Sequence, residues 1–559
     1  MAGKARPRAA RKTALRVNTP LFFLTAALLL LFGGYYDAMV FPAGALLGVL
    51  LPLELRRRGT LPLPPLIWPL AGLALCAAVT LPFAVSPGMA LTGVLRWLVA
   101  LLFCLYAACY TAGERALALD GLAALGAGMA GVSTVFFLLS GGSDANGRMD
   151  GFFQYANSYA LFLLVCLALL AGKEKRSRWD WPAMAVLLLG VALTGSRGAL
   201  LLLGAGVLVW SLWQLLRRRR ALPVVLALAA LVGLGTLAAA LSGGLLLDRL
   251  GAITLESSSL NGRLLYYLDG LRLLGERPMG VGRGGYLYVQ PLIQTGPYIL
   301  KSIHNEYLQA ALDGGPAAGV LLAVLAGLCV FRRGLPLRQR GAAALLALHA
   351  AIDFDFQFFA LLLVLLLCGL GEEKRAVPLP RRGALAGAGV LTAALAWFSL
   401  PYGLAFWGQS GPAWTLWPAD LSLAEARLQS CAELEEAGAV ADAILTDTSL
   451  SMLAWDCKYA QAAVEVDYPS MTSYRYNYLL LNPYRSEVYE GMATLLETAC
   501  RQDSEHTDIY QTLAEATRRR LEEVMDRTSL LAWRIADRPD FSFAPAVLQR
   551  LNDLEEMRE

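Results

Sequence analysis

The stretch His304-Asn305-Glu306-Tyr307-Leu308 closes a polar interval, from about Ser242 to Gly315, that lies between long apolar runs. Asn261-Gly262-Arg263 stands early in this interval, and Glu276-Arg277-Pro278-Met279-Gly280-Val281-Gly282 follows in its second half. Connections of this length are uncommon unless they have a function. The interval also holds one of the three histidines of the chain and several arginines. It therefore predicts a functional loop at one face of a membrane.

The composition indicates an integral membrane protein. The chain has 559 residues, of which 57% are hydrophobic and 16% are charged, and its mean hydropathy is +0.50. Soluble globular domains are closer to a quarter charged. The formal net charge of +4 carries little information, because the charges are segregated along the chain. The bilayer is the expected surrounding, and no nucleic-acid partner is expected.

Apolar runs of spanning length recur along the chain and predict an all-α, polytopic fold of about thirteen transmembrane helices. The run 341–371 is too long for one helix and holds Asp353 and Asp355 near its centre. Two charges at mid-bilayer are costly, so we divide this run into two short helices, 341–353 and 356–371. The other expected spans are 19–35, 38–54, 63–84, 91–110, 116–140, 155–172, 180–195, 198–216, 221–242, 314–331 and about 383–403.

The distribution of arginine and lysine predicts the orientation of these spans. With a cytoplasmic N-terminus, every basic cluster falls on the cytoplasmic side, as the positive-inside rule requires. The clusters are the tail 1–18, 56–58, Arg115, 173–178, 217–220, 332–340 and 374–382. The basic tail leads into an apolar run without a small-residue cleavage site, so this run reads as a retained helix in the plasma or inner membrane. The predicted parts are a cytoplasmic tail (1–18), a membrane domain (19–403) with an extracytoplasmic loop (243–313), and an extracytoplasmic domain (404–559).

The region 404–559 predicts a soluble helical domain. Apolar residues recur at helical spacing in 421–437, 485–500 and 507–526. Asn482-Pro483-Tyr484 resembles the junction of a tetratricopeptide-type helical hairpin, although no clean repeat period emerges. We expect a docking or acceptor-recruiting module. One pair among Cys431, Cys457 and Cys500 could form a disulfide, and the spacing leaves the choice open.

Several short motifs, in order, resemble the O-antigen ligase and polymerase family over roughly residues 20–400. They are Gly151-Phe152-Phe153-Gln154-Tyr155-Ala156-Asn157, Thr194-Gly195-Ser196-Arg197-Gly198, Asn261-Gly262-Arg263, Pro278-Met279-Gly280-Val281-Gly282, and His304-Asn305-Glu306-Tyr307-Leu308 followed by Asp313-Gly314-Gly315. The resemblance implies an inverting, metal-independent glycosyltransferase of the GT-C type without a cofactor. Its donor would be a glycan on undecaprenyl diphosphate. The extra last span and the helical tail depart from the family, so the acceptor (glycan, lipid or protein) stays open.

The chemistry of such a transfer assigns roles to arginines. Negative charge develops on the departing diphosphate, and guanidinium groups pair with phosphate oxygens in a planar fork. Arg197, Arg263 and Arg96 are therefore the expected diphosphate-binding residues. The alternative for each is an interfacial cation whose head reaches water. Arg148 and Arg283 are weaker candidates.

His304 is the expected catalytic base, because the acceptor hydroxyl must lose a proton. The matched motifs add Asn305, Glu306, Gly280, Gly282 and Asn157 as supporting residues. No metal site is expected, since the acidic residues of the loop are dispersed. His349 precedes Asp353 by four residues on the same helix face, which favours a structural pair. His506 is expected to be solvated.

Other functions stay possible from the sequence alone. A ligase and a polysaccharide polymerase that joins lipid-linked repeat units differ only in the acceptor. A transporter of lipid-linked oligosaccharide would also be polytopic, but it would not need so long a loop, and no two-fold internal repeat is evident. A membrane scaffold would not need polar residues at membrane depth.

Overall fold

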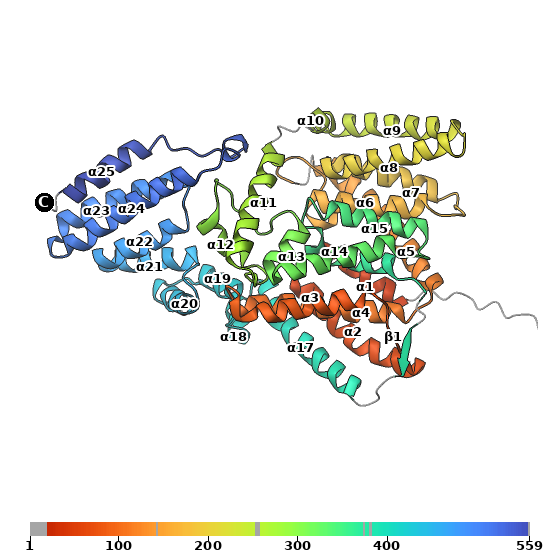
Figure 1. Cartoon of the computed structure of the whole chain (residues 1–559), viewed down its shortest axis with the longest axis horizontal. Coiled ribbons are helices and arrows are strands. Elements are labelled where there is room, and N and C mark those ends of the chain that lie inside the picture. Colours follow the sequence, from red (N-terminus) through yellow and green to blue (C-terminus); the bar gives the residue numbers. More distant parts are fainter. Residues whose placement is uncertain (1–18, 141–143, 252–257, 373–374, 379–382, 557–559) are drawn as a thin grey trace, which may run out of the picture.

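The computed structural model of the protein describes residues 19–140, 144–251, 258–372, 375–378 and 383–556 (Figure 1). The basic tail 1–18 and part of the cluster 374–382 lie outside these residues. The chain forms a bundle of long helices at one end and a smaller array of helices at the other, and the helices of residues 258–314 lie between them (Figure 1).

The bundle contains a helix at each of the segments expected to span the membrane. These helices are α1 (Thr19–Leu30), α2 (Asp37–Arg58), α3 (Ile67–Thr80), α4 (Pro87–Ala108), α5 (Ala112–Ser140), α6 (Ala156–Ala171), α7 (Asp180–Thr194), α8 (Arg197–Leu216), α9 (Leu222–Leu241), α14 (Pro316–Phe331), α15 (Leu337–His349), α16 (Phe359–Gly369) and α17 (Gly383–Phe406). By length and composition, six helices of the described chain can cross a membrane, and six further apolar helices are shorter. The protein is thus an all-α, multi-pass membrane protein, and the count of thirteen spans stays a prediction.

The division of the long apolar run is confirmed. Helix α15 ends at His349 and α16 begins at Phe359, with a short 3-10 turn, Asp355–Gln357, between them. Asp353 and Asp355 therefore lie in a helix break, where their carboxylates are buried and hydrogen-bonded. A buried charge is tolerated only with such partners, so the break is where these two acids can be accommodated.

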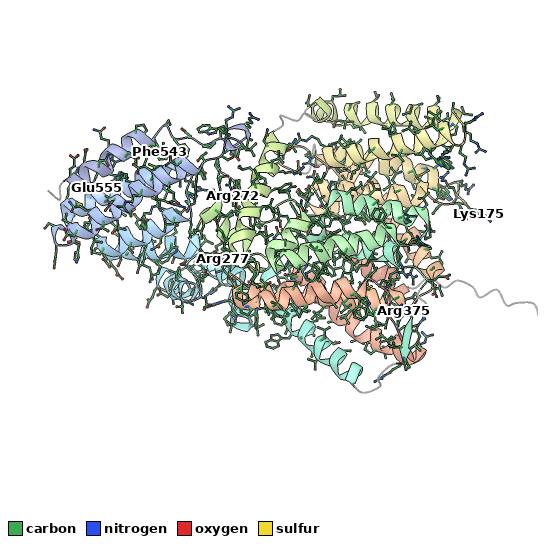
Figure 2. All side chains as sticks on the ribbon, viewed as in Figure 1. Lys175, Arg272, Arg277, Arg375, Phe543 and Glu555 are labelled. Carbon is green, nitrogen blue, oxygen red and sulfur yellow. The ribbon has the colours of Figure 1, made fainter. Side chains whose placement is uncertain are left out.

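One small element departs from an all-helical structure within the described residues. Strand β1 (Thr60–Pro62) pairs antiparallel with β2 (Ala376–Pro378). The pair lies at the end of the bundle that is far from the C-terminal helices (Figure 1). Lys175 and Arg375 lie toward this same end, whereas Arg272, Arg277 and Glu555 lie toward the other (Figure 2).

The interval expected as a loop is largely helical. It contains α10 (Leu245–Gly251), α11 (Ser258–Glu276), α12 (Tyr286–Ile293) and α13 (Glu306–Gly314). Helix α13 leads directly into α14, because Gly315 adopts a positive φ of 81° between them and Pro316 begins the next helix. Proline is well suited to the first turn of a helix, where its missing N–H is not needed. The interval therefore presents its functional residues on ordered elements.

Residues beyond α17 form a helical domain. Its helices are α18 (Ser410–Leu416), α19 (Leu421–Ser430), α20 (Leu434–Asp447), α21 (Met452–Glu465), α22 (Tyr468–Leu480), α23 (Ser486–Gln502), α24 (Thr507–Arg527) and α25 (Ala544–Glu556). The segment 421–437, where apolar residues recur at helical spacing, contains α19 and the start of α20, with a break between them. Successive helices pack on one another, but a tetratricopeptide relationship stays a prediction. Cys431, Cys457 and Cys500 are free thiols, so the disulfide that the sequence left open does not form among these three.

Candidate functional site

The carboxylate of Asp353, in the break between α15 and α16, is the centre of a polar cluster. Its Oδ1 accepts hydrogen bonds from the hydroxyl of Tyr155 (2.9 Å) and from the backbone N–H of Phe354 (3.0 Å). Its Oδ2 accepts from the side-chain amide of Asn157 (2.8 Å). The side chain is 1% exposed. An aspartate buried this deeply is stable only because its oxygens are saturated with donors.

His304 contacts the same carboxylate. Its Nδ1 lies 3.1 Å from Oδ1 of Asp353. A carboxylate can only accept, so Nδ1 carries the proton and Nε2 is left as an acceptor. The backbone of His304 is left-handed (φ 55°), an unusual conformation for a residue with a Cβ. It is held by Tyr267, whose hydroxyl donates to the His304 carbonyl (2.6 Å), and by Asn305, which caps α13.

Arg263 brings a cation to this carboxylate from α11. Its guanidinium lies 3.5 Å from Oδ2 of Asp353, and its side chain is 26% exposed. Tyr267, which holds the His304 backbone, follows Arg263 by four residues. Residues four apart lie on one face of a helix. The face of α11 that carries Arg263 and Tyr267 is therefore turned toward His304 and Asp353.

Arg197 reaches α11 from another element. It is the first residue of α8, directly after Ser196, whose side chain caps that helix. Its guanidinium donates to the hydroxyl of Ser259 (2.6 Å), which lies one helical turn before Arg263 on α11. Two of the three arginines expected to bind diphosphate are thus brought together along the first turns of α11.

Arg148 links these parts. Its Nε donates to the carbonyl of Thr194 (2.9 Å), just before the turn that leads to Arg197, and its NH2 donates to the amide oxygen of Asn157 (2.7 Å). Asn157, expected as a supporting residue, therefore bridges Arg148 and Asp353. Arg148, a weaker candidate from the sequence, therefore belongs to the cluster around Asp353.

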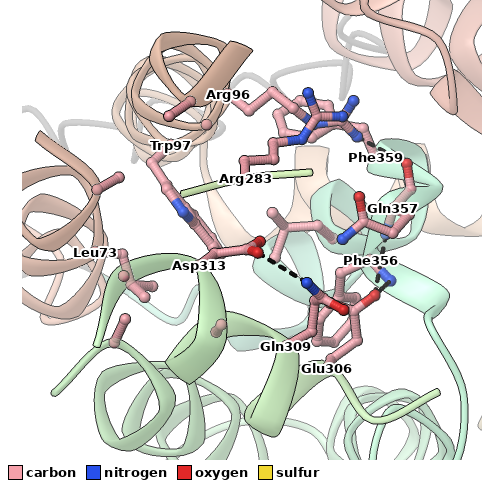
Figure 3. A pocket seen from close by; sticks show the side chains of 17 residues that line it. Leu73, Arg96, Trp97, Arg283, Glu306, Gln309, Asp313, Phe356, Gln357 and Phe359 are labelled. Carbon is pink, nitrogen blue, oxygen red and sulfur yellow. Dashed lines mark hydrogen bonds between the residues drawn. The ribbon is translucent and has the colours of Figure 1, made fainter. Parts of the chain in front are cut away.

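The structure places Arg96 in a different cluster (Figure 3). Its guanidinium pairs with Asp37 (2.8 Å), donates to the carbonyl of Gln357 (2.7 Å) and lies over the ring of Phe359. Arg283 contacts the other oxygen of Asp37 (2.7 Å). These contacts bind Arg96 within the protein, so the structure does not unite it with Arg197 and Arg263. Its role in diphosphate binding stays a prediction.

A cavity of about 60 Å³ adjoins this second cluster (Figure 3). Arg96, Arg283, Glu306, Gln309 and Asp313 are among the residues that line it. The amide of Gln309 donates to Asp313 (2.8 Å), which satisfies one carboxylate oxygen. The rest of the wall is mostly apolar, with Leu73, Trp97 and Leu362 among its residues.

Glu306 connects the histidine segment with the helix break. One carboxyl oxygen accepts from the backbone N–H groups of Phe356 (2.8 Å) and Gln357 (3.1 Å), and the Glu306 N–H donates to the Ala350 carbonyl (2.8 Å). These bonds hold both ends of the break that contains Asp353. Burial raises the pKa of Glu306 to about 8, so its side chain is mostly protonated at neutral pH.

This protonation predicts a pH dependence for stability. The folded state keeps the Glu306 proton between about pH 4.5 and 8, whereas the unfolded state loses it, so the contribution of this group is largest at acid pH and is lost as pH rises through 8. Glu306→Gln retains the accepting oxygen and should flatten the fall in unfolding temperature between pH 6 and 9. Glu306→Ala leaves two buried N–H groups without an acceptor and should destabilise at both pH values. Equal pH profiles for wild type and Glu306→Gln would contradict the assignment.

The expected pairing of His349 with Asp353 is wrong. His349 Nδ1 lies 2.7 Å from Asp355, whose other oxygen accepts from Ser158 (2.8 Å). The turn after α15 directs the two acids to different histidines. A Cβ at Gly198 would lie 3.1 Å from the His349 ring, so a glycine allows the start of α8 to approach this buried pair.

Gly280 and Gly282 support the fold rather than the cluster around Asp353. Both have a positive φ, of 83° and 79°. A Cβ at Gly280 would lie 2.8 Å from backbone atoms of Leu312 and Gly315, and one at Gly282 would lie 2.6 Å from Ala84. Glycine is required where the backbone is left-handed and closely approached. The two residues fix the segment that carries Arg283 against α13 and α4.

The comparison with known families identifies the central part of the chain. Residues 182–323 match the family model described as O-Antigen ligase. This chain carries an O-antigen ligase domain. The O-antigen ligase match makes the protein a glycosyltransferase-type enzyme of surface polysaccharide synthesis. The matched residues include Arg197, Arg263 and His304, whereas Asn157 and Asp353 lie outside them. No curated protein matches the chain.

Sequence reasoning missed two members of the cluster around the O-antigen ligase domain. The sequence predicts a structural pair for Asp353 and includes Tyr155 only as part of a motif. The one available signal was the presence of a carboxylate inside an apolar run, which is costly and often functional. For metals, no group of three or more His, Cys, Asp or Glu side chains gathers among the described residues.

Proposed function

We propose that the protein transfers a glycan from an undecaprenyl-diphosphate carrier to an acceptor hydroxyl, with inversion at the anomeric carbon. The observation that carries this proposal is the shared carboxylate of Asp353, which contacts His304 on one oxygen and Arg263 on the other. A base and a cation beside one another suit a reaction in which a hydroxyl loses a proton while an anionic group departs.

The proposed reaction is a single displacement. The acceptor oxygen attacks the anomeric carbon as its proton moves to Nε2 of His304, and the bond between that carbon and the diphosphate oxygen breaks. Asp353 orients the imidazole and stabilises the imidazolium that forms. Arg263 and Arg197 would pair with the departing diphosphate. Attack from the face opposite the leaving group inverts the anomeric configuration.

Transfer by the purified protein tests this function. Wild-type protein in detergent or vesicles, supplied with lipid-linked glycan and an acceptor glycan, should form the joined product and release undecaprenyl diphosphate. A transporter would move the lipid-linked glycan without cleaving it. If a preparation binds the donor but releases no undecaprenyl diphosphate, the proposal is contradicted.

Activity is expected to survive chelation, because guanidinium groups supply the positive charge near Asp353 in this proposal. Addition of EDTA should leave the transfer rate within about twofold of the untreated rate, since no step depends on a metal. Full loss of activity in EDTA, restored by one divalent ion, would show that a metal rather than Arg263 and Arg197 stabilises the leaving group.

The acceptor distinguishes ligase from polymerase, and the glycans of a deletion strain report it. Full-length polymer left on the lipid carrier would identify a ligase. Accumulated single repeat units would identify a polymerase. The departures of the chain from the family, its last span α17 and its C-terminal helices, favour an acceptor at the cell surface.

We also propose the orientation from the segregation of basic residues. The tail 1–18 would be cytoplasmic, and the interval 243–313 and the domain 404–559 would be extracytoplasmic. Arg263 and His304 would then face the side on which surface polymers are assembled. The test fuses to the C-terminal domain a reporter that is active only in the cytoplasm. Activity of this fusion would contradict the proposed orientation.

A further inference from the structure

Helix α11 has two covered faces with different contacts. Arg263 and Tyr267 lie on the face that contacts Asp353 and the His304 backbone. Leu265 and Asp269 are also four residues apart, and they lie about 200° around the helix from Arg263 and Tyr267. Both are fully buried. A second element therefore covers the face of α11 that is turned away from the catalytic cluster.

The cover over Leu265 comes partly from the C-terminal domain. Leu265 packs in one apolar cluster with Tyr298, Ala532 and Ile535, all of them buried. A Cβ added at Gly296 would lie 2.8 Å from side-chain atoms of both Ala532 and Leu265, so only a glycine leaves room for these two side chains here. Ala532 begins a short 3-10 turn, Ala532–Arg534, that follows α24.

Hydrogen bonds fix this C-terminal segment to the polar interval. The guanidinium of Arg527 donates to the carbonyls of Leu292 (2.9 Å) and Pro291 (3.3 Å), and the N–H of Ser529 donates to the Thr295 carbonyl (2.9 Å). The same Thr295 donates from its N–H to Asp269 on α11 (2.8 Å). The C-terminal segment is thus bound to α11 both directly and through the turn at Thr295.

The remaining face of α11 has little cover. Leu264, Leu268 and Leu271 are 44%, 48% and 55% exposed. The rotation of α11 about its axis is therefore set by the catalytic cluster on one side and by Leu265 and Asp269 on the other. In the proposed reaction Arg263 also contacts the diphosphate, whereas the contacts of Leu265 and Asp269 do not involve the substrate.

We infer that residues 527–535 of the C-terminal domain position Arg263, by packing on the opposite face of α11. This inference rests on the proposed function of Arg263 as a diphosphate ligand. It gives the C-terminal domain a part in catalysis in addition to any recruitment of an acceptor. Misplacement of a binding group by about 1 Å can lower a rate by about a hundredfold, so a contact two residues away is sufficient to matter.

A substitution that overfills this contact tests the inference. Ala532→Phe should displace Leu265 and lower kcat/KM for the lipid-linked donor by about ten- to a hundredfold, with KM for the acceptor unchanged. Leu530→Phe is the matched control: Leu530 is 83% exposed on the same segment, and its variant should keep wild-type kinetics. Arg527→Gln, which removes the donors to Pro291 and Leu292, should cause a smaller loss in the same direction, with Arg538→Gln as its exposed control.

The decisive comparison uses Arg263→Ala as the background. If Ala532→Phe acts through Arg263, it should cost little further activity there, because coupled residues are not additive. Additive losses, or a rise in acceptor KM with normal donor kinetics, would overturn the inference and assign the segment to folding or acceptor recruitment. If Ala532→Phe does not fold, the pair Arg527→Gln and Arg538→Gln decides by the same comparison. Full activity of Arg263→Ala alone would instead overturn the proposed function.

Discussion

His304→Ala should lower the turnover of saturated enzyme by about a hundredfold or more, while donor affinity changes little. The loss follows from removal of the group that accepts the hydroxyl proton, and general-base catalysis contributes about a hundred- to ten-thousandfold. Donor affinity should persist, because in the proposed site it depends on Arg197 and Arg263. Turnover and donor binding, measured separately on the purified variant, check the expectation.

Asp353→Asn should reproduce most of this loss without removing the base. An asparagine keeps the shape of the side chain but can donate to Nδ1 of His304, which would favour the wrong tautomer. His506→Ala is the control, because His506 also pairs with an aspartate, Asp503, but lies partly exposed in the C-terminal domain. If His304→Ala weakens donor binding and leaves saturated turnover intact, His304 is a diphosphate contact rather than the base.

Arg263→Ala and Arg197→Ala should each reduce glycan transfer by about thirty- to a thousandfold and leave the protein in the membrane. Loss of a charge-assisted contact to a departing diphosphate corresponds to about 2–4 kcal/mol in the barrier. Lysine should restore only part of the rate, because an ammonium lacks the planar fork. The transfer rate under saturating acceptor is the measurement.

Arg277→Ala provides the control for the two arginine variants. Arg277 follows directly after α11 and is exposed. Its substitution therefore removes the same charge from the same region without changing the cluster. Its activity should equal that of wild type. Near-normal transfer by both Arg263→Ala and Arg197→Ala would remove these arginines from the donor site.

The helical segments of the membrane domain could be predicted from the sequence, because a span needs a run of apolar residues that is visible locally. The break around Asp353 was also predictable, from the cost of charge in the bilayer. The pairing within the break was not. Asp353 lies 49 residues after His304 and 90 after Arg263, and no local pattern reports contacts over such separations.

Arg96 also shows that a sequence can indicate the need for a partner without identifying it. Its position inside a span correctly indicated that it needs a partner. That partner, Asp37, lies 59 residues earlier at the start of another helix. Local reasoning could state the requirement and could not identify the residue that meets it. Likewise, Leu265 carried no sign that residues near 532 would cover it.

The wide separation of the cluster in sequence has a consequence for biogenesis. The cluster is assembled from five separate segments that are synthesised one after another. They carry Tyr155, Arg197, Arg263, His304 and Asp353. A growing chain lacks the Asp353 carboxylate until residue 353 has been synthesised. Leu265 stays uncovered until residue 532 has been synthesised. In the proposed function, the site is therefore complete only after nearly the whole polypeptide has been made.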